Sequence, residues 1–188
     1  MQSNRRHFLK LSATGAAALS TMSAGATLSG CTSSSPATGM QVLRPEDLEL
    51  LRALTPAVLK GKVASGDAAG IDETIQSFDT LMADLSAPVV AGVQQAFDVL
   101  SFGLTRGLTT GQWSAWSKAS LEDAENALAR LRDSGIGLLN AIYAAVIRLI
   151  ISAWYLIPAN AATTGYPGPP KKVSDARPAA VPAKEARP

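Results

Sequence analysis

The sequence contains a single histidine, His7, and a single cysteine, Cys31, and both lie within its first 31 residues. The remainder of the chain can form neither a disulfide nor a metal site based on histidine or cysteine, so a fold there depends on burying apolar side chains. Its hydrophobic share of 47% is adequate for a globular domain. The same absence excludes zinc fingers, haem-attachment motifs and catalytic triads that contain histidine.

Residues 1–30 have the parts of a removable export signal. A basic region is followed by an uncharged stretch of 18 residues, Leu11–Leu28, which is rich in small residues and too weakly apolar for a stable membrane span. The basic region resembles a twin-arginine signal without the usual preceding Ser or Thr, and the residues that match are Arg5, Arg6, Phe8, Leu9 and Lys10. The alternative is an ordinary secretory signal whose basic residues happen to be arginines.

The signal ends in a sequence that resembles a bacterial lipobox, with small residues directly before Cys31. We expect Cys31 to be acylated and to begin a flexible tether over residues 31–44, which anchors the protein to a membrane surface. The alternative is cleavage after Ala26, which would leave Cys31 as a free thiol. Removal of residues 1–30 leaves 14 basic and 15 acidic residues, and this balance argues against binding to nucleic acid.

Apolar residues recur at helical spacing through residues 45–164, and no alternating strand pattern is present. The sequence therefore predicts an all-α bundle of five or six helices. One predicted helix begins at Pro88 and closes at Arg106-Gly107 because glycine commonly follows a helix end. Another helix start is predicted at Thr109-Thr110, which would place Trp113 and Trp116 on one helix face.

The last predicted helix, residues 136–157, is the most apolar part of the chain. We expect it to be a central helix that is buried on most sides, because a membrane span would bury Arg148 at a cost of about 2.5–3.5 kcal/mol and would also bury Asn140. The alternative is a membrane span, with Trp154 and Tyr155 at the interface.

Residues 165–188 differ from the bundle, because six of these 24 residues are proline and five are basic. We expect a disordered tail beyond Lys171. A stiff, proline-bracketed segment loses little entropy on docking, so four residues are predicted to contact a partner: Tyr166, Pro167, Gly168 and Pro169.

The sequence offers no catalytic, cofactor-binding or metal-binding residues to predict. The acidic cluster of Glu122, Asp123 and Glu125 is explained by the positive end of a helix dipole, and no glycine-rich phosphate motif occurs. Four aromatic residues form either core or a partner surface, because Trp and Tyr contribute strongly to interfaces: Trp113, Trp116, Trp154 and Tyr155.

Several segments together resemble the gluconate 2-dehydrogenase subunit 3 family, the small subunit of flavin-dependent sugar and alcohol dehydrogenases. These segments are Arg5-Arg6, Phe8-Leu9-Lys10, residues 51–59, Ala153-Trp154-Tyr155 and residues 165–170. The resemblance implies a non-catalytic subunit that binds a large FAD-containing subunit of the GMC oxidoreductase type and supplies the twin-arginine signal that its partner lacks. Electrons would pass from that partner to a cytochrome c subunit or another acceptor.

We therefore expect an escort and anchoring subunit rather than an enzyme, exported by the twin-arginine translocase and lipid-anchored in the periplasm, with FAD held by the partner. The alternative is a freestanding helical periplasmic lipoprotein that binds a small apolar ligand or supports the envelope.

Overall fold

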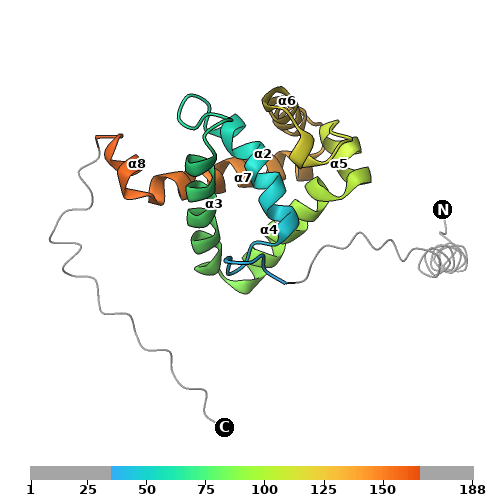
Figure 1. Ribbon diagram of the computed structural model, residues 1–188. Helices are drawn as coiled ribbons and strands as arrows, with labels where there is room; N and C mark the ends of the chain where they lie inside the picture. Colours follow the sequence, from blue (N-terminus) through green and yellow to red (C-terminus); the bar gives the residue numbers. More distant parts are fainter. Residues whose placement is uncertain (1–34, 166–188) are drawn as a thin grey trace, which may run out of the picture.

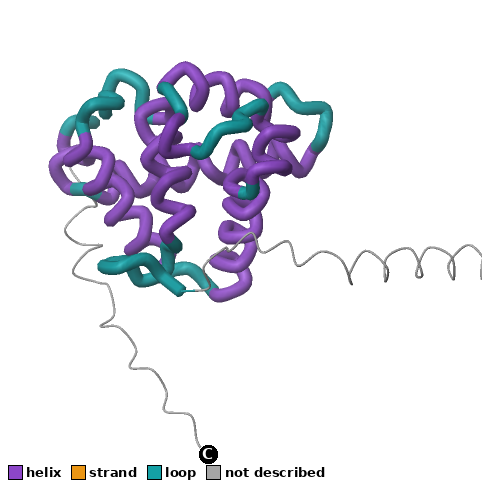
Figure 2. The backbone as a smooth tube through the Cα atoms, turned by 45° about the vertical axis from the view of Figure 1, so that its right-hand side comes forward, coloured by secondary structure: helices purple, strands orange, loops and turns teal. Residues whose placement is uncertain are grey.

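Helices form all the regular structure in residues 35–165, the part of the chain that the computed structural model describes (Figures 1 and 2). The elements are α2 (Pro45–Val58), α3 (Ala68–Ala83), α4 (Ala87–Ser101), α5 (Gly103–Thr110), the 3₁₀ turn η1 (Trp116–Lys118), α6 (Leu121–Arg132), α7 (Gly137–Leu156) and α8 (Pro158–Ala162). The all-α prediction is confirmed. The predicted number of five or six helices is too low, because seven α-helices lie in the described range.

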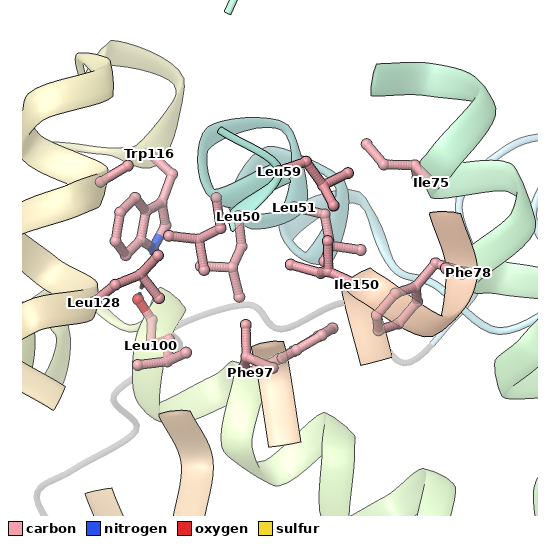
Figure 3. Packing of buried hydrophobic residues seen from close by; sticks show 14 of the residues in the cluster. Leu50, Leu51, Leu59, Ile75, Phe78, Phe97, Leu100, Trp116, Leu128 and Ile150 are labelled. Carbon is pink, nitrogen blue, oxygen red and sulfur yellow. Dashed lines mark hydrogen bonds between the residues drawn. The ribbon is translucent and has the colours of Figure 1, made fainter. Parts of the chain in front are cut away.

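Helix α2 is the centre of the bundle and packs against α3, α4, η1, α6 and α7 (Figure 1). Three of its leucines are at most 1% exposed: Leu50, Leu51 and Leu54. Figure 3 shows Leu50 facing Trp116 and Leu128, while Leu51 lies on the side of Ile150 and Phe78. Side chains from opposite sides of the bundle thus meet on one helix. The helix predicted over residues 136–157 also packs against α2, α3 and α6, but it is not buried on most sides as predicted.

The additional helices arise at a break that apolar periodicity did not predict, at Phe102, and beyond the predicted end of the last helix, at Ile157. Phe102 is extended, with φ −67° and ψ 125°, and separates α4 from α5, which are bent by 83° relative to each other. The carbonyls freed at the end of α4 accept hydrogen bonds from α5: the Thr105 hydroxyl donates to Val99 at 2.7 Å and the Arg106 guanidinium donates to Ser101 at 2.7 Å. These bonds stabilise the break because helix-terminal carbonyls need partners.

The second break follows Ile157, which is also extended and precedes Pro158. Proline disfavours a helical conformation in the residue before it, so α7 ends there and α8 begins in a new direction. The Asn160 side chain donates to the Trp154 carbonyl at 3.2 Å and satisfies part of the α7 terminus.

The segment that enters α2 is folded onto α3, although residues 31–44 were predicted to form a flexible tether. The buried carboxylate of Asp79 in α3 accepts three backbone hydrogen bonds, from Gln41 at 2.7 Å and from Val42 and Leu43 at 2.9 Å. Leu43 is 1% exposed. The folded domain therefore begins before Pro45. We call residues 37–44 the entry strap.

Arg44 connects the end of the entry strap to α2 and α4. Its guanidinium contacts the Asp47 carboxylate at 2.9 Å and the Asp98 carboxylate at 2.8 Å. The hydrogen bond to Asp47 raises the pKa of Arg44 in spite of its burial, so this residue keeps its positive charge. The start of α2 is thereby held against both α3 and α4.

Helix α7 is buried along one face rather than on most sides. It packs against α3, α6 and α2 through six buried residues: Leu139, Ile142, Val146, Ile150, Ala153 and Trp154. Within residues 35–165 it is the one unbroken helix with the length and mean hydropathy, 1.6, of a membrane span, and 33% of that stretch is buried; the bent α4–α5 pair passes the same test together. Its packing favours a core helix with an apolar outer face.

We predict that Asp79→Ala lowers the free energy of unfolding by about 2–5 kcal/mol, because three backbone N–H groups lose their acceptor where water has little access. The matched control is Asp72→Ala, which removes an exposed ion pair to Arg52 and is expected to cost at most about 1 kcal/mol. Urea denaturation of both variants measures the difference. Equal stability of the two variants would contradict the role given to Asp79.

Candidate partner interface

Two of the four aromatic residues singled out from the sequence are part of the core. Trp116 is 3% exposed, and its indole N–H donates to the Leu100 carbonyl at 2.7 Å. Trp154 is 6% exposed and lies edge-on to Tyr155, with ring centroids 5.0 Å apart. Neither tryptophan is available to a partner in this conformation.

The other two aromatic side chains are exposed but do not share a surface. Trp113 is 63% exposed and follows α5, whereas Tyr155 is 46% exposed and lies just before α8. Helices α5 and α8 lie at opposite ends of the bundle (Figure 1). The predicted sharing of a helix face by Trp113 and Trp116 is wrong, because α5 ends at Thr110 and no helix spans both tryptophans.

The ring of Trp113 rests on the backbone of Gly107 in α5. A Cβ atom added at Gly107 would lie 2.6 Å from Cζ3 of the indole, which is closer than any side chain tolerates. Gly107 was predicted to end a helix, but it lies inside α5, and Gly111 takes the end position with φ +80°. Gly107 is therefore important for packing under Trp113, whereas the sequence pattern predicted that it ends a helix.

Two arginines fix the loop that carries Trp113. The Arg106 guanidinium donates to the carbonyls of Gln112, at 3.0 Å, and of Trp113, at 3.3 Å. The Arg130 guanidinium lies against Gly111, where an added Cβ would be 3.0 Å from its Cζ. The loop is thus held from α5, and Arg130 of α6 packs beside it.

Two leucines one turn apart on α5 add apolar surface beside this loop. Leu104 is 57% exposed and Leu108 is 68% exposed. Together with Trp113 they form what we call the Trp113 patch. Tryptophan is enriched among the residues that contribute most to the energy of protein interfaces.

A second apolar feature is a groove of about 510 Å³ between α4 and α7. Its lining residues are Val89, Gly92, Val93, Gln95, Ala96, Phe97, Val99, Leu138, Ala141, Ile142, Ala145, Val146 and Leu149. Gln95 is the one polar side chain among them. A Cβ at Gly92 would meet nothing within 4 Å, so this glycine faces open space. We call this feature the α4–α7 groove.

The buried ionisable groups of the described residues bind backbone groups or one another. Arg44, Asp47 and Asp79 are buried. Arg44 is paired with Asp47, and Asp79 accepts hydrogen bonds from the entry strap. In the predicted acidic cluster, hydrogen bonds from the backbone and hydroxyl of Ser120 hold the pKa of Asp123 below its usual range. Glu125 contacts Lys60 at 2.8 Å.

No group of three His, Cys, Asp or Glu residues within 35–165 is placed to hold a metal ion. A polar cleft of about 500 Å³ between the Trp113 loop and α6 is lined by Arg130, Asp123 and Asp133 among others. These carboxylates are engaged elsewhere, because Asp123 accepts from Ser120 and Asp133 contacts Arg132 at 2.8 Å.

The remaining predicted site residues lie outside the described range. They are the signal residues Arg5, Arg6, Phe8, Leu9 and Lys10, the lipidation site Cys31, and the tail residues Tyr166, Pro167, Gly168 and Pro169.

A comparison of the chain with protein-family models finds no match, and comparisons with curated proteins and with solved structures find none either.

Sequence reasoning identified Trp113 by residue type but missed Gly107, Arg106 and the α4–α7 groove. A Gly107–Trp113 contact has no signature in the sequence, because it depends on how the loop after α5 folds back. The groove depends on the separation of two helices that lie far apart in the chain.

Proposed function

We propose that this chain is a non-catalytic small subunit that escorts an FAD-dependent dehydrogenase of the GMC type through twin-arginine export and anchors it at the periplasmic membrane surface. The observation that carries the proposal is Trp113, an exposed residue whose ring lies on Gly107 and whose backbone carbonyl accepts a hydrogen bond from Arg106. A tryptophan that is 63% exposed leaves most of its apolar surface in water in the isolated domain, and such a side chain is well suited to binding a protein.

The distribution of polar groups supports a binding role over a catalytic one. Catalytic sites gather titratable groups in a cleft, where burial and neighbouring charges adjust their pKa values. Here the buried carboxylates of Asp47 and Asp79 bind backbone N–H groups or Arg44, and the exposed surfaces with distinctive chemistry are apolar.

The export signal supports the escort role. Twin-arginine export carries folded proteins, and the described domain buries a continuous apolar core without any disulfide. A small folded protein with no cofactor motif gains from that route when a cofactor-loaded partner travels with it. Cys31 at the end of the signal would then hold the exported complex at a membrane.

We predict that the full chain, carrying a C-terminal tag and isolated from native membranes, brings with it a flavoprotein identified by its flavin absorbance and by mass spectrometry. Cys31→Ser is expected to release the complex into the soluble periplasmic fraction, because the lipid attachment is lost. The paired changes Arg5→Lys and Arg6→Lys are expected to keep both proteins in the cytoplasm. A colourless monomer from wild-type membranes would contradict the proposal.

The α4–α7 groove favours a second candidate function, a freestanding lipoprotein that binds a small apolar ligand. Its lining is almost entirely aliphatic, with Gln95 as the polar exception. Ligand pockets for apolar molecules have this character, although most also carry several polar groups that orient the ligand.

For this candidate we predict saturable binding of cis-parinaric acid that Gly92→Leu weakens at least about tenfold by filling the groove, a loss typical of a blocked apolar contact. The substitution suits the helix, because glycine has a low helix propensity. Gly135→Leu is the matched control, since a Cβ there also meets nothing within 4 Å. Equal binding by wild type and both variants would exclude the groove as a ligand site.

A further inference from the structure

We propose that residues 178–183 of this chain, Pro-Ala-Ala-Val-Pro-Ala, bind in the α4–α7 groove and cover it in the isolated protein. This contact is independent of the proposed function, because both of its sides belong to one chain. A partner or ligand that uses the groove would have to displace this segment.

The α4–α7 groove leaves apolar side chains in contact with water. At its rim Val89 is 48% exposed and Leu138 is 65% exposed, and Gln95 is the one polar side chain of its lining. Gly92 has no side chain, so the backbone of an occupant can approach α4 closely there. Contiguous apolar surface bordered by polar residues marks a site that another segment or molecule covers.

The exposed face of α7 leads from the groove to α8. Residues 138, 141, 145, 149, 152 and 156 recur at intervals of three and four, so they lie on one face of the helix. None of them is buried, and Leu156, at the α8 end of this face, is 57% exposed. A segment that follows α8 can therefore pass along α7 into the groove without displacing a buried residue of α7.

The chain after α8 is long enough to make this contact. The backbone between Leu149, the groove residue of α7 nearest α8, and Gly165 spans at most about 35 Å, because most of it is helical. Pro178 follows Gly165 by 13 residues, which span about 40 Å in the polyproline II conformation. Residues 178–183 then span about 19 Å, and the groove extends about 17 Å along α7 from Leu149 to Leu138.

Residues 178–183 also have the composition that suits this groove. They are the longest run without a charge after Gly165, and each of them is Pro, Ala or Val. Their two prolines have no backbone N–H. This matters because the backbones of α4 and α7 are hydrogen-bonded within their own helices and the lining offers one polar side chain, Gln95. A segment with fewer donors loses less hydration energy on burial.

Other uncharged segments outside the described range fit the groove less well. Residues 166–170 begin directly after Gly165 and span about 16 Å, so they cannot both cross from α8 and fill the groove. Residues 31–34 are Cys, Thr, Ser and Ser. The apolar stretch of residues 11–28 belongs to the signal that we expect to be removed.

Attachment to the domain favours binding of this segment in spite of its entropic cost. The sequence predicts disorder beyond Lys171, so binding orders the segment and opposes part of the interaction energy. A short flexible connection nevertheless holds the segment at an effective concentration on the order of 1 mM. A contact of modest affinity is therefore occupied, and a tighter ligand can displace it.

Disulfide trapping in the full chain tests this contact, in a Cys31→Ser background that removes the one native thiol. Gly92→Cys places a thiol in the groove at a position where a Cβ meets nothing within 4 Å. The matched control is Gly66→Cys, which is equally open but lies between α2 and α3. A second cysteine is placed in turn at three positions that cover the segment: Ala179, Ala180 and Ala183.

At least one of these positions is expected to form an intramolecular disulfide with Gly92→Cys at least about tenfold faster than with Gly66→Cys, because binding raises the local thiol concentration. Adding Val181→Asp is expected to abolish the difference, since burial of a charge opposes binding. Circular dichroism verifies that each variant is folded.

Equal rates with the two glycine positions would overturn the proposal and leave the groove to another occupant. A rate that Val181→Asp does not change would overturn it too, because the disulfide would then report only chance encounters. A disulfide that joins two copies of the chain would also overturn it, since the occupant would be the segment of a second copy.

Discussion

The Asp79 carboxylate is the interaction on which the arrangement of the bundle depends. It accepts the backbone N–H groups of three successive residues of the entry strap and thereby fixes where α2 begins. Because α2 packs against most of the other helices, its starting point determines which of its leucines face each neighbour. Arg44 then joins the same junction to α4 through Asp98. A buried carboxylate is stable here because hydrogen bonds replace its hydration.

Apolar periodicity was sufficient to predict an all-helical domain and the approximate bounds of α7. It failed at Phe102 and at residues 37–44, where tertiary hydrogen bonds determine the local structure. Asp79 is 36 residues from Leu43 in sequence, so nothing near the strap signals its acceptor. The prediction for α7 overestimated its burial because overall hydrophobicity does not reveal that one face lines a groove.

The residue types of the candidate site could be predicted from the sequence, but their exposure could not. Residue type drew attention to Trp113 and Tyr155, but exposure separates them from Trp116 and Trp154, and exposure follows from packing. The packing of the Trp113 ring on Gly107 is also a tertiary contact, so it too could not be predicted from residue type. A glycine in a helix lowers local stability, and at Gly107 it leaves room for the Trp113 ring to pack on α5.

The features of the chain fit a division of labour between this protein and a partner. The domain folds through an apolar core, binds its buried charges to backbone or to one another, and leaves an exposed tryptophan and an apolar groove on its surface. The measurement that tests the escort role most directly is the location of the flavoprotein in cells that lack this chain. Our account predicts that the flavoprotein remains in the cytoplasm, with its FAD bound, until the chain is restored. A flavoprotein that reaches the periplasm at its normal level in those cells would contradict the account.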